Sequence, residues 1–141
     1  MKIQAKIDYA CRALLELSKH WPNQSPLQVS DIAERQRLPI KFLIQLLIML
    51  KQFGYVQSIR GQKGGYILAK PPKEIRLSEI LRNLSNDKDL QQSGHLSRNQ
   101  DVFKAIWQET DQATFKVLSA ITFEDIIKRE QVLSKVPVYT I

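Results

Sequence analysis

The sequence predicts a mainly α-helical fold with one small β-hairpin, and three observations support this fold class. Apolar residues recur at three- and four-residue steps in several stretches, notably 3–21, 39–53 and 97–120, which is the spacing of amphipathic helices. The stretches YVQSI and YILA are rich in β-branched and aromatic residues and predict two short strands. The RGQKGG segment between them contains three of the five glycines, as expected for a hairpin turn.

The first three predicted helices carry start or stop signals. Residues 3–21 form one amphipathic face and end before Pro22. Ser30 is a suitable N-cap for a short helix to about residue 37. Pro39 fits the first turn of the next helix, which Gly54 would end after residue 53. Two helices separated by so short a turn predict a helix-turn-helix.

The helix over residues 39–53 has two distinct faces. Its inward face is predicted to hold Leu43, Leu46, Leu47, Leu50 and Phe53, and its outward face Lys41, Gln45, Ile48 and Gln52. Hydrogen-bonding side chains near a helix start suit a recognition helix in the DNA major groove. When this helix is considered by itself, its outward residues are explained equally well as an ordinary solvent-exposed face.

The hairpin that follows favours the DNA-binding interpretation. A hairpin directly after a helix-turn-helix is a wing, and Arg60 and Lys63 at a glycine-lined tip suit a DNA minor groove or its phosphates. A nucleotide-binding phosphate loop is the rival. It is disfavoured because no Lys-Ser or Lys-Thr follows GQKGG and the segment leads into a strand.

The part of the chain after the hairpin predicts a segment through which two copies of the protein associate. Residues 70–73 read as a stiff connector to a helix over 77–84, residues 85–98 as a polar loop, and Ser97 with Gln100 as the cap of a long helix. The apolar arc of that helix spans nearly half of its circumference, so we expect part of it to meet a second copy of the chain. Burial within its own monomer is the alternative. Thr122 and Asp125 start a last short helix, and residues 131–141 read as a loosely held tail.

Charge and composition narrow the function. Residues 1–84 contain 14 Lys and Arg against 6 Asp and Glu, whereas residues 85–141 contain 7 against 8. This asymmetry favours a nucleic-acid-binding part and a partner-binding part over general solubility. No stretch approaches the roughly 20 apolar residues of a membrane span, and the charged N-terminus is unlike a secretion signal, so we expect a cytoplasmic protein. No paired carboxylates, nucleophile-base set or metal-ligand spacing predict an enzyme or a metal site.

The stretches IDYACRALLEL, VSDIAERQRLPIKFLIQLLIMLKQFGYVQSIRGQKGGYILAKPP and VLSAITFEDI resemble the Rrf-two family of bacterial winged-helix transcription regulators. The resemblance covers most of residues 1–84 and the end of the long helix. It implies a homodimer that binds palindromic promoter DNA, mostly as a repressor, with the long helix crossing its partner. It also implies base contacts at Lys41, Ile44 and Gln45, and a minor-groove contact at Arg60.

Two features depart from that family. Many members hold an iron-sulfur cluster on three cysteines before the long helix, but residues 85–98 contain none, so we expect no cofactor. The one cysteine, Cys11, has packing as its default role and redox sensing as the alternative. Ile44, Ile48 and Met49 stand where relatives tend to have polar, small or basic residues. Thymine methyl groups in an A/T-rich half-site would suit them, and so would packing on another protein element.

These observations predict a winged helix-turn-helix over 1–84, a loop over 85–98, and a dimerisation helix, short helix and tail over 99–141. The predicted DNA contacts are Lys2, Ser30, Lys41, Ile44, Gln45, Lys51, Arg60, Gln62, Lys63 and Tyr66. The predicted dimer contacts are Val102, Phe103, Ile106, Trp107, Ala113, Val117 and Ile121. The partners are double-stranded DNA and a second copy, with an unknown effector or protein partner left open. The alternative is a winged-helix protein-interaction module.

Overall fold

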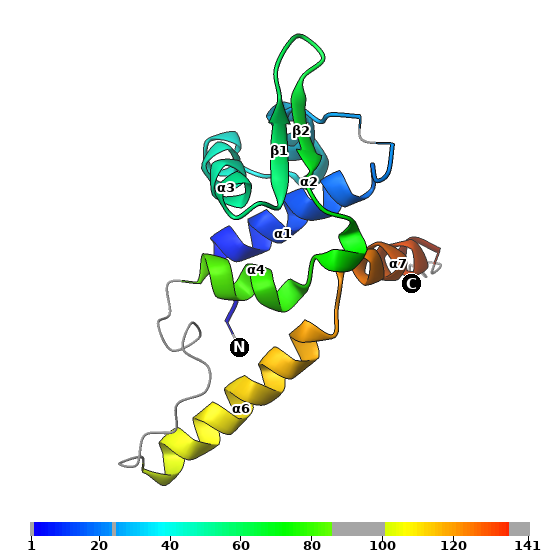
Figure 1. The fold of residues 1–141 in the computed structure, drawn as a ribbon. Helices are drawn as coiled ribbons and strands as arrows, with labels where there is room; N and C mark the ends of the chain where they lie inside the picture. The colour runs from blue at the N-terminus through cyan, green and yellow to red at the C-terminus, as the bar shows by residue number, and fades with distance from the viewer. Residues whose placement is uncertain (1, 24, 86–100, 136–141) are drawn as a thin grey trace, which may run out of the picture.

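The computed structural model describes residues 2–23, 25–85 and 101–135 and has the predicted fold class (Figure 1). Its helices and strands, in chain order, are α1 (Ala5–Ser18), α2 (Val29–Gln36), α3 (Ile40–Gln52), β1 (Val56–Ile59), β2 (Gly65–Leu68), the 3-10 turn η1 (Pro72–Glu74), α4 (Leu77–Leu84), α6 (Val102–Ser119) and α7 (Phe123–Lys135). No helix in the described part of the chain is both long and apolar enough to cross a bilayer.

Helix α1 lies at the centre of the fold. It contacts α2, α3, α4, α7 and β2, and its apolar face, including the fully buried Leu14, joins one core cluster with Ile32, Leu47 and Ile80. The helix is shorter at both ends than the predicted 3–21. The helix-turn-helix, the hairpin and α4 therefore pack around α1 in a single core.

The helix-turn-helix is confirmed, but the predicted cap of its first helix is wrong. Gln28 is the N-cap of α2, with extended backbone, and forms a capping box with Asp31. Ser30 is an exposed residue inside the first turn. At the other end Arg37 adopts the left-handed conformation, with φ 54° and ψ 51°, and turns the chain toward α3.

Helix α3 is one residue shorter at each end than the predicted 39–53, because Pro39 is its N-cap and Phe53 its C-cap, and it has nearly the predicted faces. Leu43, Leu46, Leu47 and Leu50 are buried. Phe53 is 42% exposed, so its predicted inward position is wrong. Phe53 is the C-cap, and the chain turns away at Gly54, whose φ is 82°. Phe53 lies just after the last helical residue, so the helical spacing that predicted its inward position does not apply to it.

The hairpin is confirmed, and the start of β2 is fixed to the segment before α2. Strands β1 and β2 pair antiparallel with Val56 opposite Leu68 and Ile59 opposite Gly65. Tyr66 also pairs with Leu27: the Leu27 amide donates to the Tyr66 carbonyl at 3.0 Å, and the Tyr66 amide donates to the Leu27 carbonyl at 2.8 Å. This bridge holds the wing beside the helix-turn-helix.

After the wing, the chain passes through η1 into α4, which has the predicted bounds 77–84 and buries Ile80, Leu81 and Leu84. The predicted cap at Ser97 and Gln100 lies outside the described residues, as does the loop 85–98 apart from Ser85. Asp101 caps α6 by accepting a hydrogen bond from the Lys104 amide at 2.8 Å.

The last helix is longer than predicted. The Thr122 and Asp125 cap is present, because the Asp125 amide donates to Thr122 Oγ1 and the Thr122 amide donates to Asp125 Oδ2. From there α7 runs to Lys135, so the start of the predicted loose tail is helical. Phe123 is fully buried in the core, which ties α7 to the rest of the fold.

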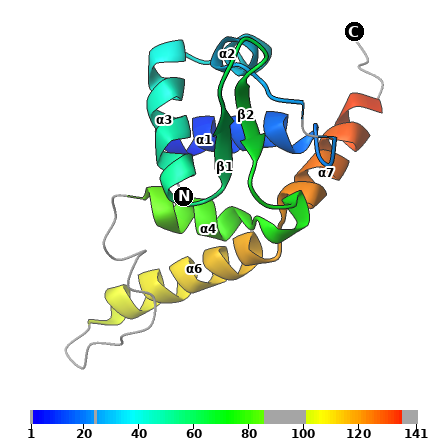
Figure 2. The same cartoon turned by 45° about the horizontal axis from the view of Figure 1, so that its top comes forward.

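Helix α6 extends away from the body, on the opposite side of α4 from the wing (Figures 1 and 2). None of its residues is buried. The alternative of a long helix buried within its own monomer is therefore wrong. Its apolar side chains are available to another molecule.

Candidate nucleic-acid interface

The outward face of α3 carries the side chains predicted to read DNA. Lys41, Gln45, Ile44 and Ile48 are all exposed, on the side of the helix opposite the buried leucines. α3 contains no acidic residue. The face therefore offers one cation, one amide and apolar groups near the helix start, where a recognition helix approaches base edges.

The wing tip presents the remaining predicted contacts. Arg60, Gln62 and Lys63 are exposed in the turn between the strands. The turn is closed by the Gly64 amide, which donates to the Gly61 carbonyl at 3.0 Å. A Cβ at Gly64 would lie 2.1 Å from the Ile59 carbonyl oxygen, so glycine there lets the turn close. A Cβ at Gly61 would meet nothing within 4 Å, so the backbone of the tip is open to a groove at that position.

A side-chain hydrogen bond joins the helix to the wing. Lys51, in the last turn of α3, donates from Nζ to Ser58 Oγ on β1 at 2.9 Å. Both side chains remain exposed. Lys51 therefore links the end of α3 to β1, a contact that its position in the sequence alone did not predict.

The remaining predicted DNA contacts, Lys2, Ser30 and Tyr66, lie on three different segments and differ in exposure. Lys2 precedes α1 and Ser30 lies on α2, and both are exposed. Tyr66 is half-buried and packs against the core, so less of its side chain is free for a phosphate. The structure thus exposes the predicted residues of α3 and of the wing tip, places Lys2 and Ser30 on other segments, and leaves Tyr66 of β2 partly covered.

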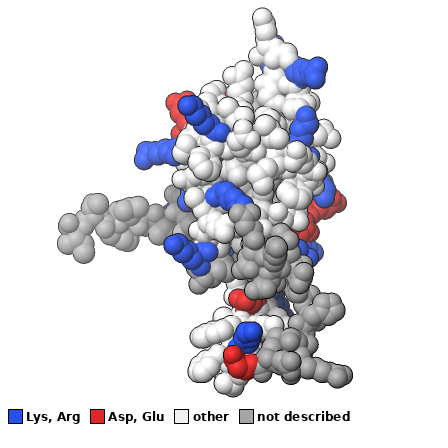
Figure 3. Space-filling model, turned by 90° about the vertical axis from the view of Figure 1, so that its left-hand side faces the viewer, with Lys and Arg blue, Asp and Glu red and all other residues white. Residues whose placement is uncertain are grey.

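A long acid-free interval produces the charge of this surface. Residues 35–73 contain eight Lys and Arg and no Asp or Glu, and they include all of α3 and the wing. Figure 3 views the side that carries α3: basic side chains lie from the wing tip downward, the surface between them is uncharged, and acidic atoms over the upper part appear at its edges. This interval was readable in the sequence, and it adds Arg37 and Lys70 as exposed cations.

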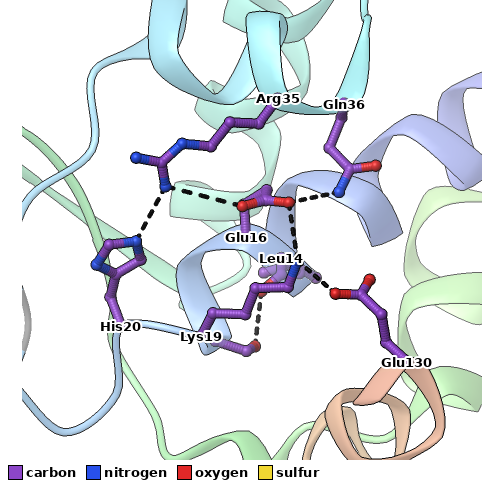
Figure 4. Close-up of polar contacts among 8 residues, drawn as sticks. Leu14, Glu16, Lys19, His20, Arg35, Gln36 and Glu130 are labelled. Atoms are coloured by element: carbon purple, nitrogen blue, oxygen red, sulfur yellow. Dashed lines mark hydrogen bonds and ion pairs between the residues drawn. The ribbon is translucent and has the colours of Figure 1, made fainter. Parts of the chain in front are cut away.

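A buried carboxylate organises the polar contacts behind this surface (Figure 4). Glu16 of α1 has a 6% exposed side chain and accepts hydrogen bonds from Gln36 of α2 at 2.6 Å and from Lys19 at 3.1 Å. Lys19 also pairs with Glu130 of α7 at 2.5 Å. Partial burial alone would lower the pKa of Lys19, but the bonds to Glu130 and Glu16 outweigh it, so this pKa is raised. The network joins α1, α2 and α7.

The residues that the structure describes do not form an iron site. Within the described residues, no group of three or more His, Cys, Asp or Glu side chains is placed to hold a metal ion. Cys11 packs against the core, and burial, with a smaller contribution from Asp8, raises the pKa of its thiol to about 12. A thiol that stays protonated is a poor metal ligand and nucleophile. The packing role of Cys11 is therefore favoured over redox sensing.

The apolar arc of α6 is a second exposed surface. Val102, Phe103, Ile106, Trp107 and Val117 are 44 to 66% exposed, Ala113 is exposed, and Ile121 is half-buried. The Phe103 and Trp107 rings stack at 6.3 Å between centroids. Another side of α6 faces α4, where the Arg82 guanidinium lies 4.4 Å from the Phe115 ring centroid. The chain itself leaves this apolar arc uncovered.

Comparison with known proteins agrees with this architecture. A profile of the family Rrf2, described as "Iron-dependent Transcriptional regulator", matches residues 3–129. A putative HTH-type transcriptional regulator of Synechocystis is 37% identical over 129 residues, covering 89% of this chain and 87% of the relative. The structure of T. potens IscR has a TM-score of 0.82 at 32% identity and covers 99% of this chain and 95% of that one. The structure of CymR, the global cysteine regulator of B. subtilis, has a TM-score of 0.78 at 29% identity, covering 92% and 98%.

These relatives regulate transcription and are not enzymes, which agrees with the prediction that the chain has no catalytic activity. The profile spans most of the chain, and the relatives match along nearly their whole length. The chain therefore belongs to the Rrf2 family of helix-turn-helix transcription regulators, as the resemblance predicted.

Proposed function

We propose that the protein is a homodimeric, sequence-specific DNA-binding regulator that acts as a repressor at a palindromic operator. The observation that carries this proposal is the acid-free basic surface formed by α3 and the wing. In this proposal residues 1–84 bind DNA, residues 85–98 link the two parts, and residues 99–141 carry the dimerisation helix.

Sequence reading and positioning are divided between the two elements. The Lys41 and Gln45 side chains reach base edges in the major groove, and Arg60 enters the adjoining minor groove. The contacts that position the protein on sugar and phosphate come from Lys2, Ser30, Lys51, Gln62, Lys63 and Tyr66. A Gln side chain can bond an adenine edge twice, so Gln45 contributes direct specificity.

The apolar arc of α6 supports the homodimer. Five large apolar side chains exposed along one helix, including a stacked Phe103 and Trp107, would cost solvation free energy in an isolated monomer. A second copy offers the same arc, and a two-fold pair of identical helices buries both. The pair would present two α3 helices to half-sites about 34 Å apart.

Repression follows from occupancy. A dimer that covers two successive turns of promoter DNA excludes other proteins from that stretch. The family description includes iron dependence, but the chain contains a single cysteine, which is partly buried and packs against the core. We therefore expect operator binding to be the same with and without added iron.

Selection of duplexes from a random library, followed by fluorescence anisotropy, tests DNA binding. Arg60→Ala and Gln45→Ala should each weaken binding to the selected duplex by about 1–3 kcal/mol. Arg129→Ala is the matched control, because Arg129 is an exposed arginine on α7, at the side away from α3 and the wing (Figure 1). Wild-type affinity should fall steeply between about 50 and 200 mM salt. Binding that is insensitive to salt and to both substitutions would contradict the proposal and favour a protein-interaction module.

Sedimentation analysis tests the dimer. Trp107→Glu places a charge within the apolar arc and should convert the protein to a monomer that binds a palindromic duplex weakly. Gln112→Glu adds the same charge at an exposed position of α6 outside the arc and should leave the dimer intact. A Trp107→Glu protein that remains dimeric, like Gln112→Glu, would show that the apolar arc of α6 is not the dimer contact.

A further inference from the structure

Three isoleucines form an apolar stripe on the outward face of the recognition helix. Ile40, Ile44 and Ile48 follow one another at four-residue steps on α3 and are 46, 41 and 41% exposed. None of them belongs to the core cluster or to the apolar residues packed against it. This isoleucine stripe lies beside Lys41 and Gln45.

The stripe has the dimensions of a groove-reading surface. Eight residues of α-helix separate Ile40 from Ile48, which is about 12 Å of helix. Base pairs in duplex DNA follow one another at about 3.4 Å along each strand. The stripe can therefore face several consecutive base pairs while Gln45 bonds one of them.

The surroundings of the stripe favour DNA over an apolar protein surface. The cations closest to it in sequence are Arg37, Lys41 and Lys51, and no acidic residue occurs between positions 35 and 73. A partner must then be apolar at the stripe and anionic around it. The thymine 5-methyl group, flanked by backbone phosphates, meets both conditions, because it is the apolar group that the major-groove edges of the four bases present.

We propose, resting on the proposed DNA-binding function, that the isoleucine stripe reads thymine 5-methyl groups in the operator. Recognition is then shared: Lys41 and Gln45 read hydrogen-bonding groups, and the stripe reads methyl groups. The operator half-site is accordingly rich in thymine where α3 lies in the groove.

Replacing thymine by deoxyuridine tests this step because it removes only the methyl group and keeps base pairing and every hydrogen-bonding group. The probe is the duplex selected by the wild-type protein, synthesised with one thymine at a time replaced by deoxyuridine. Each contacted thymine should lose about fourfold in affinity, the value of one buried methyl group. Ile44→Ala or Ile48→Ala should bind the thymine duplex more weakly and abolish the penalty at its own position, whereas Gln45→Ala should keep it. The substituted isoleucines are exposed, so both variants should retain the urea midpoint of the wild type.

The outcomes separate the two proposals. Equal affinity for thymine and deoxyuridine duplexes, with normal salt-dependent binding, overturns the methyl readout and leaves the DNA-binding function standing. A deoxyuridine penalty that persists in Ile40→Ala, Ile44→Ala and Ile48→Ala also overturns the readout. Failure of the wild-type protein to bind any selected duplex overturns both.

Discussion

The bridge between β2 and Leu27 gives the sharpest test of how the hairpin is held, and Gly65→Ala is the change that probes it. A Cβ atom at position 65 would lie 2.3 Å from the Leu27 carbonyl oxygen and 2.5 Å from the Leu27 carbonyl carbon. These are backbone atoms, so no side chain can rotate away. The φ of Gly65 is also 151°, a conformation that other residues rarely adopt.

The expected cost has two parts. The unfavourable φ contributes about 1–3 kcal/mol. Relieving the collision requires Leu27 to move away and lose its two backbone hydrogen bonds with Tyr66, each worth about 0.5–1.5 kcal/mol. Gly61→Ala is the matched control, because its φ is 111° and a Cβ there meets nothing within 4 Å. It bears only the first cost, so Gly65→Ala should be less stable than Gly61→Ala by about 1–3 kcal/mol.

Urea unfolding followed by circular dichroism measures this difference. With a slope of about 1–3 kcal/mol/M for a protein of this size, the midpoint of Gly65→Ala should lie roughly 0.5–2 M below that of Gly61→Ala. All samples need the same protein concentration, since dimerisation couples stability to concentration. Equal midpoints for the two variants would refute the claim that the close approach of β2 to Leu27 anchors the wing.

The remaining predictions concern ionisation. Burial first, and then nearby acidic groups, Asp8 and Glu79, raise the pKa of the Cys11 thiol and the Tyr55 phenol to about 12 from 9.0 and 10.0. As the pH rises, the Cys11 and Tyr55 side chains therefore lose their protons in the unfolded chain before they do so in the folded protein. The free energy of unfolding should fall from about pH 9 upward, by up to roughly 1.4 kcal/mol per pH unit for each proton. Urea midpoints that stay constant up to about pH 11 would contradict this. Cys11 should also react with an aromatic disulfide reagent far more slowly in the native state than in urea at about pH 8, and equal rates would show that the thiol is accessible.

The sequence predicted the elements whose signals are local. The leucine spacing of α3, the strands on either side of RGQKGG and the Thr122 and Asp125 cap depend on residues within a few positions of one another, and all three are present. The outward face of α3 follows from the same spacing, because burying four leucines leaves the opposite side exposed. Fold class and candidate interface were therefore largely readable without coordinates.

The errors arose where distant residues decide the local structure. Ser30 has the better intrinsic capping side chain, but Leu27 is held by Tyr66, thirty-nine positions later, and this bridge places Gln28 at the helix start. The role of Lys51 depends on Ser58, which is brought close only when the hairpin folds back on α3. The burial of Phe123 likewise depends on its amide bonding to the Ile75 carbonyl. No helical or strand periodicity carries these contacts.

The joint between α6 and the rest of the chain links the two proposed surfaces. Arg76 donates from Nη1 to the Ser119 carbonyl at 2.7 Å, and the Leu77 amide donates to the Ile121 carbonyl at 2.9 Å, so the end of α6 is bonded to the start of α4. Beyond the joint, α7 returns to α1, where Glu130 pairs with Lys19 beside the carboxylate that holds Gln36 of α2. The C-terminal end of α6 is thus tied to α4 directly and to α1 through α7. In a dimer formed through α6, the separation of the two α3 helices would then be set by this joint and not by the hairpins, so the spacing of operator half-sites is a property of the residues around Arg76 even though none of them lies at the DNA surface.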